Sequence, residues 1–210
     1  AVVPLFVLDP ALWAAAGAPR QARLLASLRS LDADLRDRYA VSLVVRIGSP
    51  LTVVPALATE VGAVAVHVTA ETTPYGRRRD TAVRAALNAQ GRELVATGTA
   101  YAIGPGTVRT GGGTPYRVFT PFARAWREHG WPQPCEEPAD LVLGRASDDP
   151  RAPAMLAEAL AACPIPLPEP GEPGAAAAWS RFLSDRVGRS GTGSRRRLRR
   201  AHQARVTGSG

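Results

Sequence analysis

Short apolar runs alternate with longer stretches of helical periodicity over the first hundred residues. Strand-like runs occupy residues 2–8, 43–47, 63–68 and 93–96. Between them, apolar residues recur at helical spacing over residues 20–38, 55–61 and 77–90. This alternation predicts βαβ units and therefore an α/β protein built on a parallel sheet. Ligands of such folds bind at the carboxyl ends of the strands, which are here Asp9–Pro10, Gly48–Pro50 and Thr69–Tyr75.

Patterns in the second half of the chain are weaker. Residues 97–116 are rich in Gly, Thr and Pro and predict a loop. Residues 164–174 contain five prolines, which is typical of a linker. Helices are expected on either side of these segments, at residues 122–129, 153–162 and 175–187.

Length, apolar content and cysteine usage indicate which class of protein this is. The chain has 210 residues, of which 45% are hydrophobic, enough for a domain with a core. No apolar run reaches the roughly 18 residues that a membrane helix needs, and the start of the chain does not resemble a signal peptide. The two cysteines, Cys135 and Cys163, fit a reducing compartment. We therefore expect a cytoplasmic protein, monomeric and without a membrane partner.

The net charge of +8 is concentrated in a basic tail. Residues 189–210 contain seven arginines and no acidic residue, which leaves 19 arginines against 18 acidic residues in the rest of the chain. The tail is expected to be disordered, and it is interpreted either as binding nucleic-acid phosphates nonspecifically or as attracting any polyanion. The arginines expected to make these contacts are Arg195, Arg196, Arg197, Arg199 and Arg200.

Few residues carry a recognisable chemical motif. The histidines lack metal-ligand spacing, and His67, inside an apolar run, is expected to be a hydrogen-bonded core residue. Arg77–Asp80 is expected to open a helix. It is interpreted either as a solvated first turn with ion pairs or as a phosphate or ligand site at a strand's carboxyl end. No catalytic or metal-binding residue is assigned.

Three stretches of the sequence, taken in order, resemble the N-terminal domain of the DNA photolyase/cryptochrome family. They are residues 2–10 followed by Arg23–Leu28, then Pro74–Asp80, and then Gly113–Phe122 with Trp126 beyond it. The resemblance implies a Rossmann-like doubly wound parallel sheet that holds an antenna pigment. In this family a separate helical domain binds FAD and uses light to split cyclobutane pyrimidine dimers in DNA.

The resemblance also implies how the chain is divided. Residues 1–131 correspond to the α/β domain, 132–174 to an interdomain linker with a short helix, and 175–188 to the first helix of the FAD-binding domain. Residues 189–210 depart from the family and form the basic tail, which is interpreted as either a frameshift or a genuine alternative end.

The match begins at what resembles the family's second strand, so the family's first, central strand is missing from the sequence. Its loss would leave the strands near Leu5 and Val66 without a common neighbour. Unpaired backbone groups are costly when buried, so we expect a marginal or aggregating fold.

The resemblance suggests one pigment contact. Tyr75 and Gly76 stand where folate-binding relatives have Asn and Glu, so the chain is more similar to deazaflavin-binding relatives. In those an acid four residues before the tyrosine bonds the pigment, and Glu71 occupies that place. The alternative is that Glu71 is an exposed loop carboxylate.

These observations predict an N-terminal fragment of a DNA photolyase-like protein, inactive alone. The FAD site and the DNA partner would belong to the intact parent enzyme. The alternative from another class is a non-enzymatic α/β ligand-binding module with a nucleic-acid-binding tail. A cryptochrome-like photosensor fragment is a third option.

Overall fold

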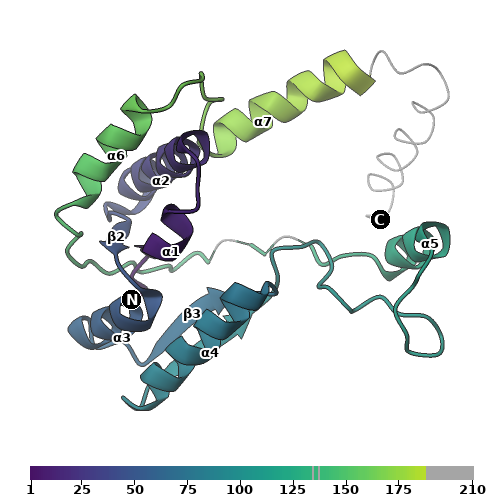
Figure 1. Ribbon diagram of the computed structural model, residues 1–210, viewed down its shortest axis with the longest axis horizontal. Helices are drawn as coiled ribbons and strands as arrows, with labels where there is room; N and C mark the ends of the chain where they lie inside the picture. Colours follow the sequence, from purple (N-terminus) through teal and green to yellow (C-terminus); the bar gives the residue numbers. More distant parts are fainter. Residues whose placement is uncertain (134, 137, 188–210) are drawn as a thin grey trace. The chain divides into compact units, whose positions relative to one another are not determined.

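The computed structural model describes residues 1–133, 135–136 and 138–187 (Figure 1). The predictions for the basic tail, including the five arginines of residues 195–200, lie outside the described residues. The chain divides into two compact units. One combines Ala1–Ala15 with Leu43–Ala152, and the other combines Ala16–Ser42 with the described residues that follow Ala152. The domain boundaries expected from the family resemblance stay predictions.

The first unit confirms the predicted α/β class with parallel strands. Its elements in chain order are β1 (Leu5–Leu8), α1 (Pro10–Trp13), β2 (Val44–Ile47), α3 (Pro50–Glu60), β3 (Ala65–Thr69), α4 (Pro74–Asn88), β4 (Glu93–Thr97) and α5 (Phe119–His129).

The four strands form two separate parallel sheets. β1 pairs with β2, with Leu5 opposite Val44, and β3 pairs with β4, with Ala65 opposite Glu93. Within the described residues no ladder joins β1 to β3. This arrangement agrees with the prediction that the strands near Leu5 and Val66 lack a common neighbour.

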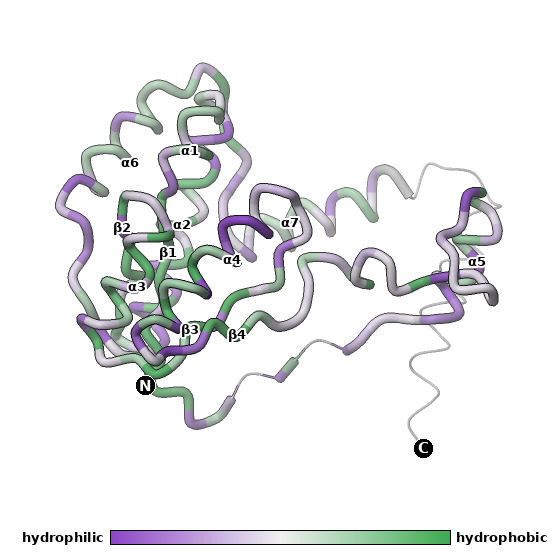
Figure 2. Tube along the Cα trace, turned by 60° about the horizontal axis from the view of Figure 1, so that its bottom comes forward, coloured by the Kyte–Doolittle hydropathy of each residue, from purple (hydrophilic) through white to green (hydrophobic). Residues whose placement is uncertain are grey.

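An apolar core lies against one face of the β3–β4 sheet, between the strands and the helices α3 and α4. Leu87 of α4 is completely buried, and Val66 and Val68 of β3 pack against the same cluster. Its buried members are Ala58, Val83, Leu87 and Leu94. Figure 2 shows the contrast between the hydrophobic strands and the strongly hydrophilic start of α4.

His67 corrects an expectation from the sequence. It was predicted to be a core residue because it lies within an apolar run, but its side chain is exposed. Since successive side chains of a strand point to opposite faces, Val66 and Val68 take the core face and His67 takes the other. Alternation along the strand therefore decides its burial, whereas the apolar neighbours do not.

The second unit is helical. Its helices are α2 (Ala18–Tyr39), α6 (Ala152–Ala161, in this unit from Pro153) and α7 (Gly171–Phe182), which continues as a π-helical turn over Leu183–Val187. Helix α2 contacts α7, and the Arg23 guanidinium donates to the carbonyl oxygens of Pro168 and Glu169 at 2.6 and 3.0 Å. Trp179 and Phe182 stack with ring centroids 5.6 Å apart and are largely exposed.

Several helices begin earlier than the sequence predicts. α3 begins at Pro50 instead of residue 55, α4 at Pro74 instead of 77, α5 at Phe119 instead of 122, and α7 at Gly171 instead of 175. Proline is well suited to the first turn, where its missing N–H has no helical partner. Pro50 and Pro74 each occupy that position, so they start their helices and do not interrupt the chain.

The described residues contain neither a membrane-spanning helix nor a cluster of metal-binding side chains. No helix there combines the length and apolar character needed to cross a membrane. No group of three or more His, Cys, Asp or Glu side chains there is arranged to hold a metal ion.

Candidate functional site at the carboxyl ends of β1 and β3

Asp9 and Tyr75 join the carboxyl end of β1 to the beginning of α4. Asp9 follows β1 directly and is only 7% exposed. Its Oδ1 accepts a hydrogen bond from the Ala11 N–H at 3.0 Å, which caps α1, and its Oδ2 accepts one from the Tyr75 hydroxyl. A buried carboxylate needs such donors, and here they come from two elements that are far apart in sequence.

The hydrogen bond to Asp9 changes the titration of Tyr75. Because its hydroxyl donates to the carboxylate, the pKa of Tyr75 is raised above its ordinary value. Partial desolvation acts in the same direction. Tyr75 is therefore a neutral hydroxyl donor at neutral pH.

Glu71, the residue predicted to contact a pigment, folds back onto its own loop. Its Oε1 accepts hydrogen bonds from the backbone N–H groups of Thr72 at 2.7 Å and Thr73 at 3.0 Å. These bonds, that from Thr73 first, hold the pKa of Glu71 below its usual value. Glu71 is therefore an ionised acceptor at neutral pH, with one oxygen already engaged.

Gly76 is required by the path of the Glu71 side chain. A Cβ atom built on Gly76 would lie only 1.7 Å from Glu71 Cγ. The backbone N–H of Gly76 also donates to Thr73 Oγ1 at 3.1 Å, which makes Thr73 the N-cap of α4. The loop, the cap and the first turn of α4 thus depend on a residue without a side chain.

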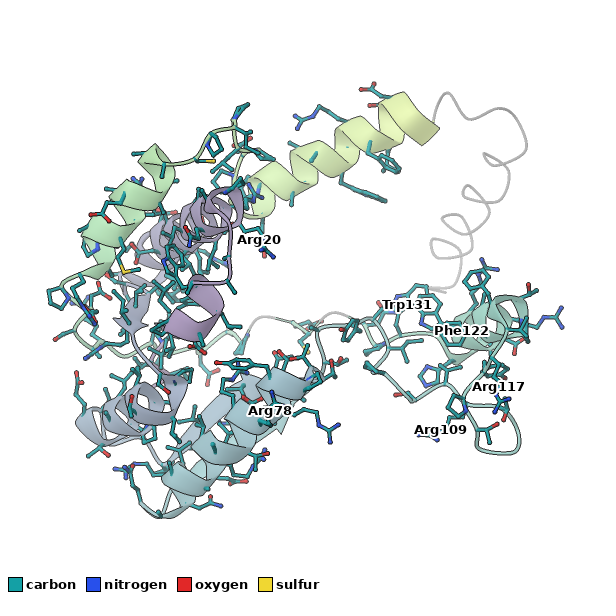
Figure 3. The ribbon with its side chains drawn as sticks, viewed as in Figure 1. Arg20, Arg78, Arg109, Arg117, Phe122 and Trp131 are labelled. Carbon is teal, nitrogen blue, oxygen red and sulfur yellow. The ribbon has the colours of Figure 1, made fainter. Side chains whose placement is uncertain are left out.

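The arginines at the start of α4 have different surroundings. Arg79 pairs with Asp80, with Nη2 and Oδ1 2.7 Å apart, as the ion-pair interpretation predicts. Arg77 and Arg78 line an open hollow of about 590 Å³ together with Thr72, Pro74 and Thr81. Figure 3 shows Arg78 on α4. The hollow offers two cations and the Thr72 hydroxyl to a ligand, whereas the Thr81 hydroxyl already donates to the Arg77 carbonyl oxygen at 2.8 Å. The ligand interpretation of Arg77 and Arg78 stays a prediction.

Sequence reasoning placed Asp9 and Tyr75 at strand ends but missed that they bond each other. They are 66 residues apart, and no spacing rule connects them. The available signal was that both follow buried parallel strands, whose carboxyl ends meet at one edge of a fold. The two cysteines lie away from this cluster in sequence, and both are free.

The third sequence motif forms an aromatic segment around α5. The rings of Tyr116 and Phe122 meet edge to face at 6.2 Å, and those of Trp126 and Trp131 lie 5.2 Å apart. Phe119 nevertheless is 77% exposed. Figure 3 shows Phe122 on α5 and Trp131 near its end, with Arg109 and Arg117 on the neighbouring loop. None of these residues contributes to the Asp9–Tyr75 cluster.

Comparison with known proteins gives a consistent result. The family model for DNA photolyase matches residues 1–139. A deoxyribodipyrimidine photo-lyase of Halobacterium salinarum is 35% identical over 192 residues, covering 90% of this chain and 39% of the relative. A deoxyribodipyrimidine photo-lyase of Streptomyces griseus is 44% identical over 133 residues, covering 61% of this chain and 29% of the relative.

A solved structure supports the fold. The crystal structure of a class III photolyase from Agrobacterium tumefaciens superimposes with a TM-score of 0.68 at 23% identity. The match covers 87% of this chain and 39% of that structure. This chain therefore spans well under half the length of these relatives.

Proposed function

Because this chain belongs to the DNA photolyase family, we propose that it is the N-terminal part of a photolyase-like DNA repair protein. The intact parent would use light and FAD to split cyclobutane pyrimidine dimers. The observation that carries this proposal is the match to the H. salinarum photo-lyase over 90% of the chain. Since that match covers 39% of the relative, we assign the FAD site, the DNA surface and the reaction to the rest of the parent.

On this proposal, residues 1–210 alone do not repair DNA. The test is an oligonucleotide with one thymine dimer, incubated with the chain, FAD, a reductant and near-ultraviolet light. We expect no dimer splitting by the chain alone, and splitting by a photolyase relative treated in parallel. Repair by residues 1–210 would overturn the assignment of the reaction to the rest of the parent.

The DNA of the locus tests the parentage itself. We expect a neighbouring reading frame to encode a strand that precedes residue 1 and a helical, flavin-binding region that follows residue 188. If neither is encoded, the parent-enzyme proposal fails. A cytoplasmic location and a monomeric state stay predictions.

We further propose that the cluster at the carboxyl ends of β1 and β3 contributes to an antenna site, with Glu71 as one contact. A deazaflavin ring carries an imide N–H, and Glu71 is an ionised acceptor whose Oε1 bonds the loop, which leaves Oε2 for the ring. The pigment's contribution would be to absorb light. The chain's contribution would be to hold and orient it.

Titration with an 8-hydroxy-5-deazaflavin, followed by its fluorescence, tests this contact. We expect Glu71→Gln to weaken binding about tenfold, because a hydrogen bond to a charged acceptor becomes one to a neutral acceptor. The control is Glu93→Gln, an exposed carboxylate at the start of β4. Equal affinity of the Glu71→Gln variant and the unaltered chain would remove Glu71 from the site.

The alternative, a ligand-binding module with a nucleic-acid-binding tail, makes a separate prediction. It requires salt-sensitive DNA binding that disappears when residues 189–210 are deleted. DNA binding that survives this deletion would contradict it.

A further inference from the structure

Aromatic side chains are concentrated in the segment that contains α5. The chain has four residues each of Phe, Trp and Tyr. Half of them lie within residues 98–131, which we call the α5 segment: Tyr101, Tyr116, Phe119, Phe122, Trp126 and Trp131. Aromatic rings stabilise a fold by being buried, yet α5 has no buried residue, and Tyr101, Phe119 and Trp131 are exposed. The concentration of rings here is therefore not explained by a core.

The α5 segment is also the basic part of the described chain. Its four arginines, Arg109, Arg117, Arg124 and Arg127, stand against one acidic residue, Glu128. The other residues up to position 188 contain 15 arginines and 17 acidic residues. Positive charge and exposed rings are thus gathered in the same short stretch, while the rest of the described chain is slightly acidic.

Three of these arginines are available to a ligand. Arg109 is engaged within its own loop, because its Nε donates to the Gly106 carbonyl at 2.9 Å and its Nη1 to the Gly113 carbonyl at 3.0 Å. The side chains of Arg117, Arg124 and Arg127 are exposed. Within the part of the chain that the structure describes, these three make no ion pair.

Helical spacing places the rings and the cations side by side. Phe119, Phe122 and Trp126 recur at intervals of three and four residues and so share one face of α5. Arg124 and Arg127, three residues apart, follow the neighbouring face. The contacts of Tyr116 with Phe122 and of Trp126 with Trp131 extend the row of rings beyond both ends of the helix. Figure 3 shows labelled side chains of both kinds around α5.

The combination of rings and cations indicates the kind of partner. A protein partner would need acidic side chains interleaved with apolar ones, and many membrane-surface helices are about 20–30 residues long, whereas α5 has 11. A single strand of nucleic acid alternates a phosphate with a flat base along its whole length. Bases stack on aromatic rings and phosphates pair with cations, so this alternation matches exposed rings beside arginines that have no ion pair.

We propose that the α5 segment binds single-stranded DNA without sequence preference. In this assignment bases stack on the exposed rings of Phe119 and Trp131, and phosphates pair with Arg117, Arg124 and Arg127. A helix of 11 residues is about 16 Å long. With the flanking rings, the row would hold about four nucleotides, at the lower end of the range for single-strand sites.

This binding surface goes beyond the proposed photorepair and uses residues outside the basic tail. Only the choice of DNA over RNA rests on the proposed function, because the ring and phosphate contacts are common to both. If the α5 segment binds no strand, the photorepair and locus tests are unaffected.

Two oligomers of equal charge separate stacking from simple attraction of a polyanion. The probe is a fluorescein-labelled strand of eight thymidines, and its matched control has eight abasic tetrahydrofuran residues on the same phosphate backbone. The basic tail would attract both strands, so the difference between them reports contact with bases. By fluorescence anisotropy of the full chain, we expect the abasic strand to bind about tenfold or more weakly.

Variants at exposed rings locate the stacking. Phe119→Ala should weaken binding of the thymidine strand about fivefold or more and leave the affinity for the abasic strand unchanged. Trp179→Ala, at another exposed ring, is the matched control and should change neither affinity. A strand with one 2-aminopurine, whose fluorescence is quenched by stacking, should lose part of its quenching with Phe119→Ala and keep it with Trp179→Ala.

Variants at the arginines test the phosphate contacts. Replacing Arg124 and Arg127 by Gln should weaken both strands and lower the slope of log affinity against log salt concentration by about one or more. Arg181→Gln, at an exposed position of α7, is the control and should leave the slope unchanged.

Four results would overturn the proposal. They are equal affinity for the thymidine and abasic strands, an unchanged thymidine affinity in Phe119→Ala, and an unchanged salt slope in the double Arg variant. The fourth is binding to vesicles of phosphatidylserine and phosphatidylcholine that Phe119→Ala abolishes while strand binding persists, because the rings would then contact lipid. A strand of eight uridines that binds about tenfold more tightly than the thymidine strand would overturn the choice of DNA.

Discussion

The β3–β4 and β1–β2 sheets have the same two-stranded parallel construction, and both bury apolar side chains, including Leu94 in the first and Leu8 and Val44 in the second. They differ in the polar contacts that a later segment makes with the outer edge of β2. The β3–β4 sheet lies on an apolar core in which Leu87 is fully buried. The outer edge of β1–β2 is held by polar contacts from Asp148, Asp149 and Arg151. Burial of apolar surface depends little on pH, whereas contacts of carboxylates depend on it strongly. Similar apolar runs in sequence can therefore give sheets with different sensitivities.

The largest expected effect is on the apolar core of β3–β4. Leu87→Ala would leave a cavity in a fully buried position and lower the free energy of unfolding by about 2–5 kcal/mol. Urea denaturation monitored by circular dichroism measures it. The control is Leu51→Ala in α3, where the side chain is 45% exposed and the loss should be far smaller. Equal losses would contradict the position of the core.

Loss of the hydrogen bond between Tyr75 and Asp9, which joins the segments after β3 and β1, should have the next largest effect on stability. Tyr75→Phe removes a donor to the buried Asp9 carboxylate, and we expect a loss of about 1–3 kcal/mol in unfolding free energy. Tyr101→Phe, at a tyrosine that is 54% exposed, is the matched control and should be close to neutral. If both variants unfold at the same urea concentration as the unaltered chain, the hydrogen bond between Tyr75 and Asp9 does not stabilise the fold.

Loss of the Asp148 contact at the outer edge of β2 should have a smaller effect on stability. Asp148→Ala removes the acceptor of the Val45 N–H, which lies near the surface, so water replaces part of the bond. We expect a loss of about 0.5–1.5 kcal/mol in the same denaturation experiment, and faster amide exchange at Val45. Asp140→Ala, at an exposed loop position, should change neither quantity. Unchanged exchange at Val45 in Asp148→Ala would show that this edge is not held by Asp148.

The smallest predicted effect is the pH dependence that Asp149 adds at the outer edge of β2, in addition to that of Glu71, whose pKa is also lowered. Hydrogen bonds from the Arg151 side chain, and then from its backbone N–H, hold the pKa of Asp149 well below its ordinary value. A group with a lowered folded-state pKa adds stability above its unfolded pKa and loses it as the pH falls toward the folded value. We therefore expect the urea midpoint to fall as the pH drops from about 5 toward 2.

Two variants separate this contribution from the rest of the acid response. Asp149→Asn should lower the midpoint at neutral pH and flatten its decline with acid, whereas Leu87→Ala should lower the midpoint and keep the slope. If the urea midpoint of Asp149→Asn falls with acid as steeply as that of the unaltered chain, Asp149 does not contribute to the pH dependence of stability.

The sequence predicted the elements whose causes are local. Buried parallel strands read as apolar runs, and amphipathic helices as a 3.6-residue period, so the βαβ order was predicted. Helix starts were wrong at Pro50 and Pro74, which were assigned to the segments that follow the strands, although both lie in a first helical turn. The prediction that His67 is a core residue was wrong because alternation along the strand, and not the hydropathy of its neighbours, decides its burial.

The missed contacts are those between distant segments. Asp9 meets Tyr75 across 66 residues, and Asp148 meets Val45 across 103, and no motif or spacing announces either pair. Glu71 could be singled out from the family resemblance, but its hydrogen bonds to Thr72 and Thr73 follow from the local turn of the loop. The resemblance also predicted that β1 and β3 lack a common neighbour, which agrees with the two separate ladders of the described residues.

Residue-by-residue amide exchange of the chain alone tests most directly whether these are two separate sheets, each with an open edge, on β1 and on β3. Phe6, Val45, Val66 and Val68 should exchange slowly, because their N–H groups bond a neighbouring segment. Leu5, Val7, Ala65 and His67 should exchange quickly, which gives a pattern of alternate fast and slow amides along β1 and β3. Uniformly slow exchange along both strands, at every chain concentration, would show that the edges are paired within the chain and would contradict this account.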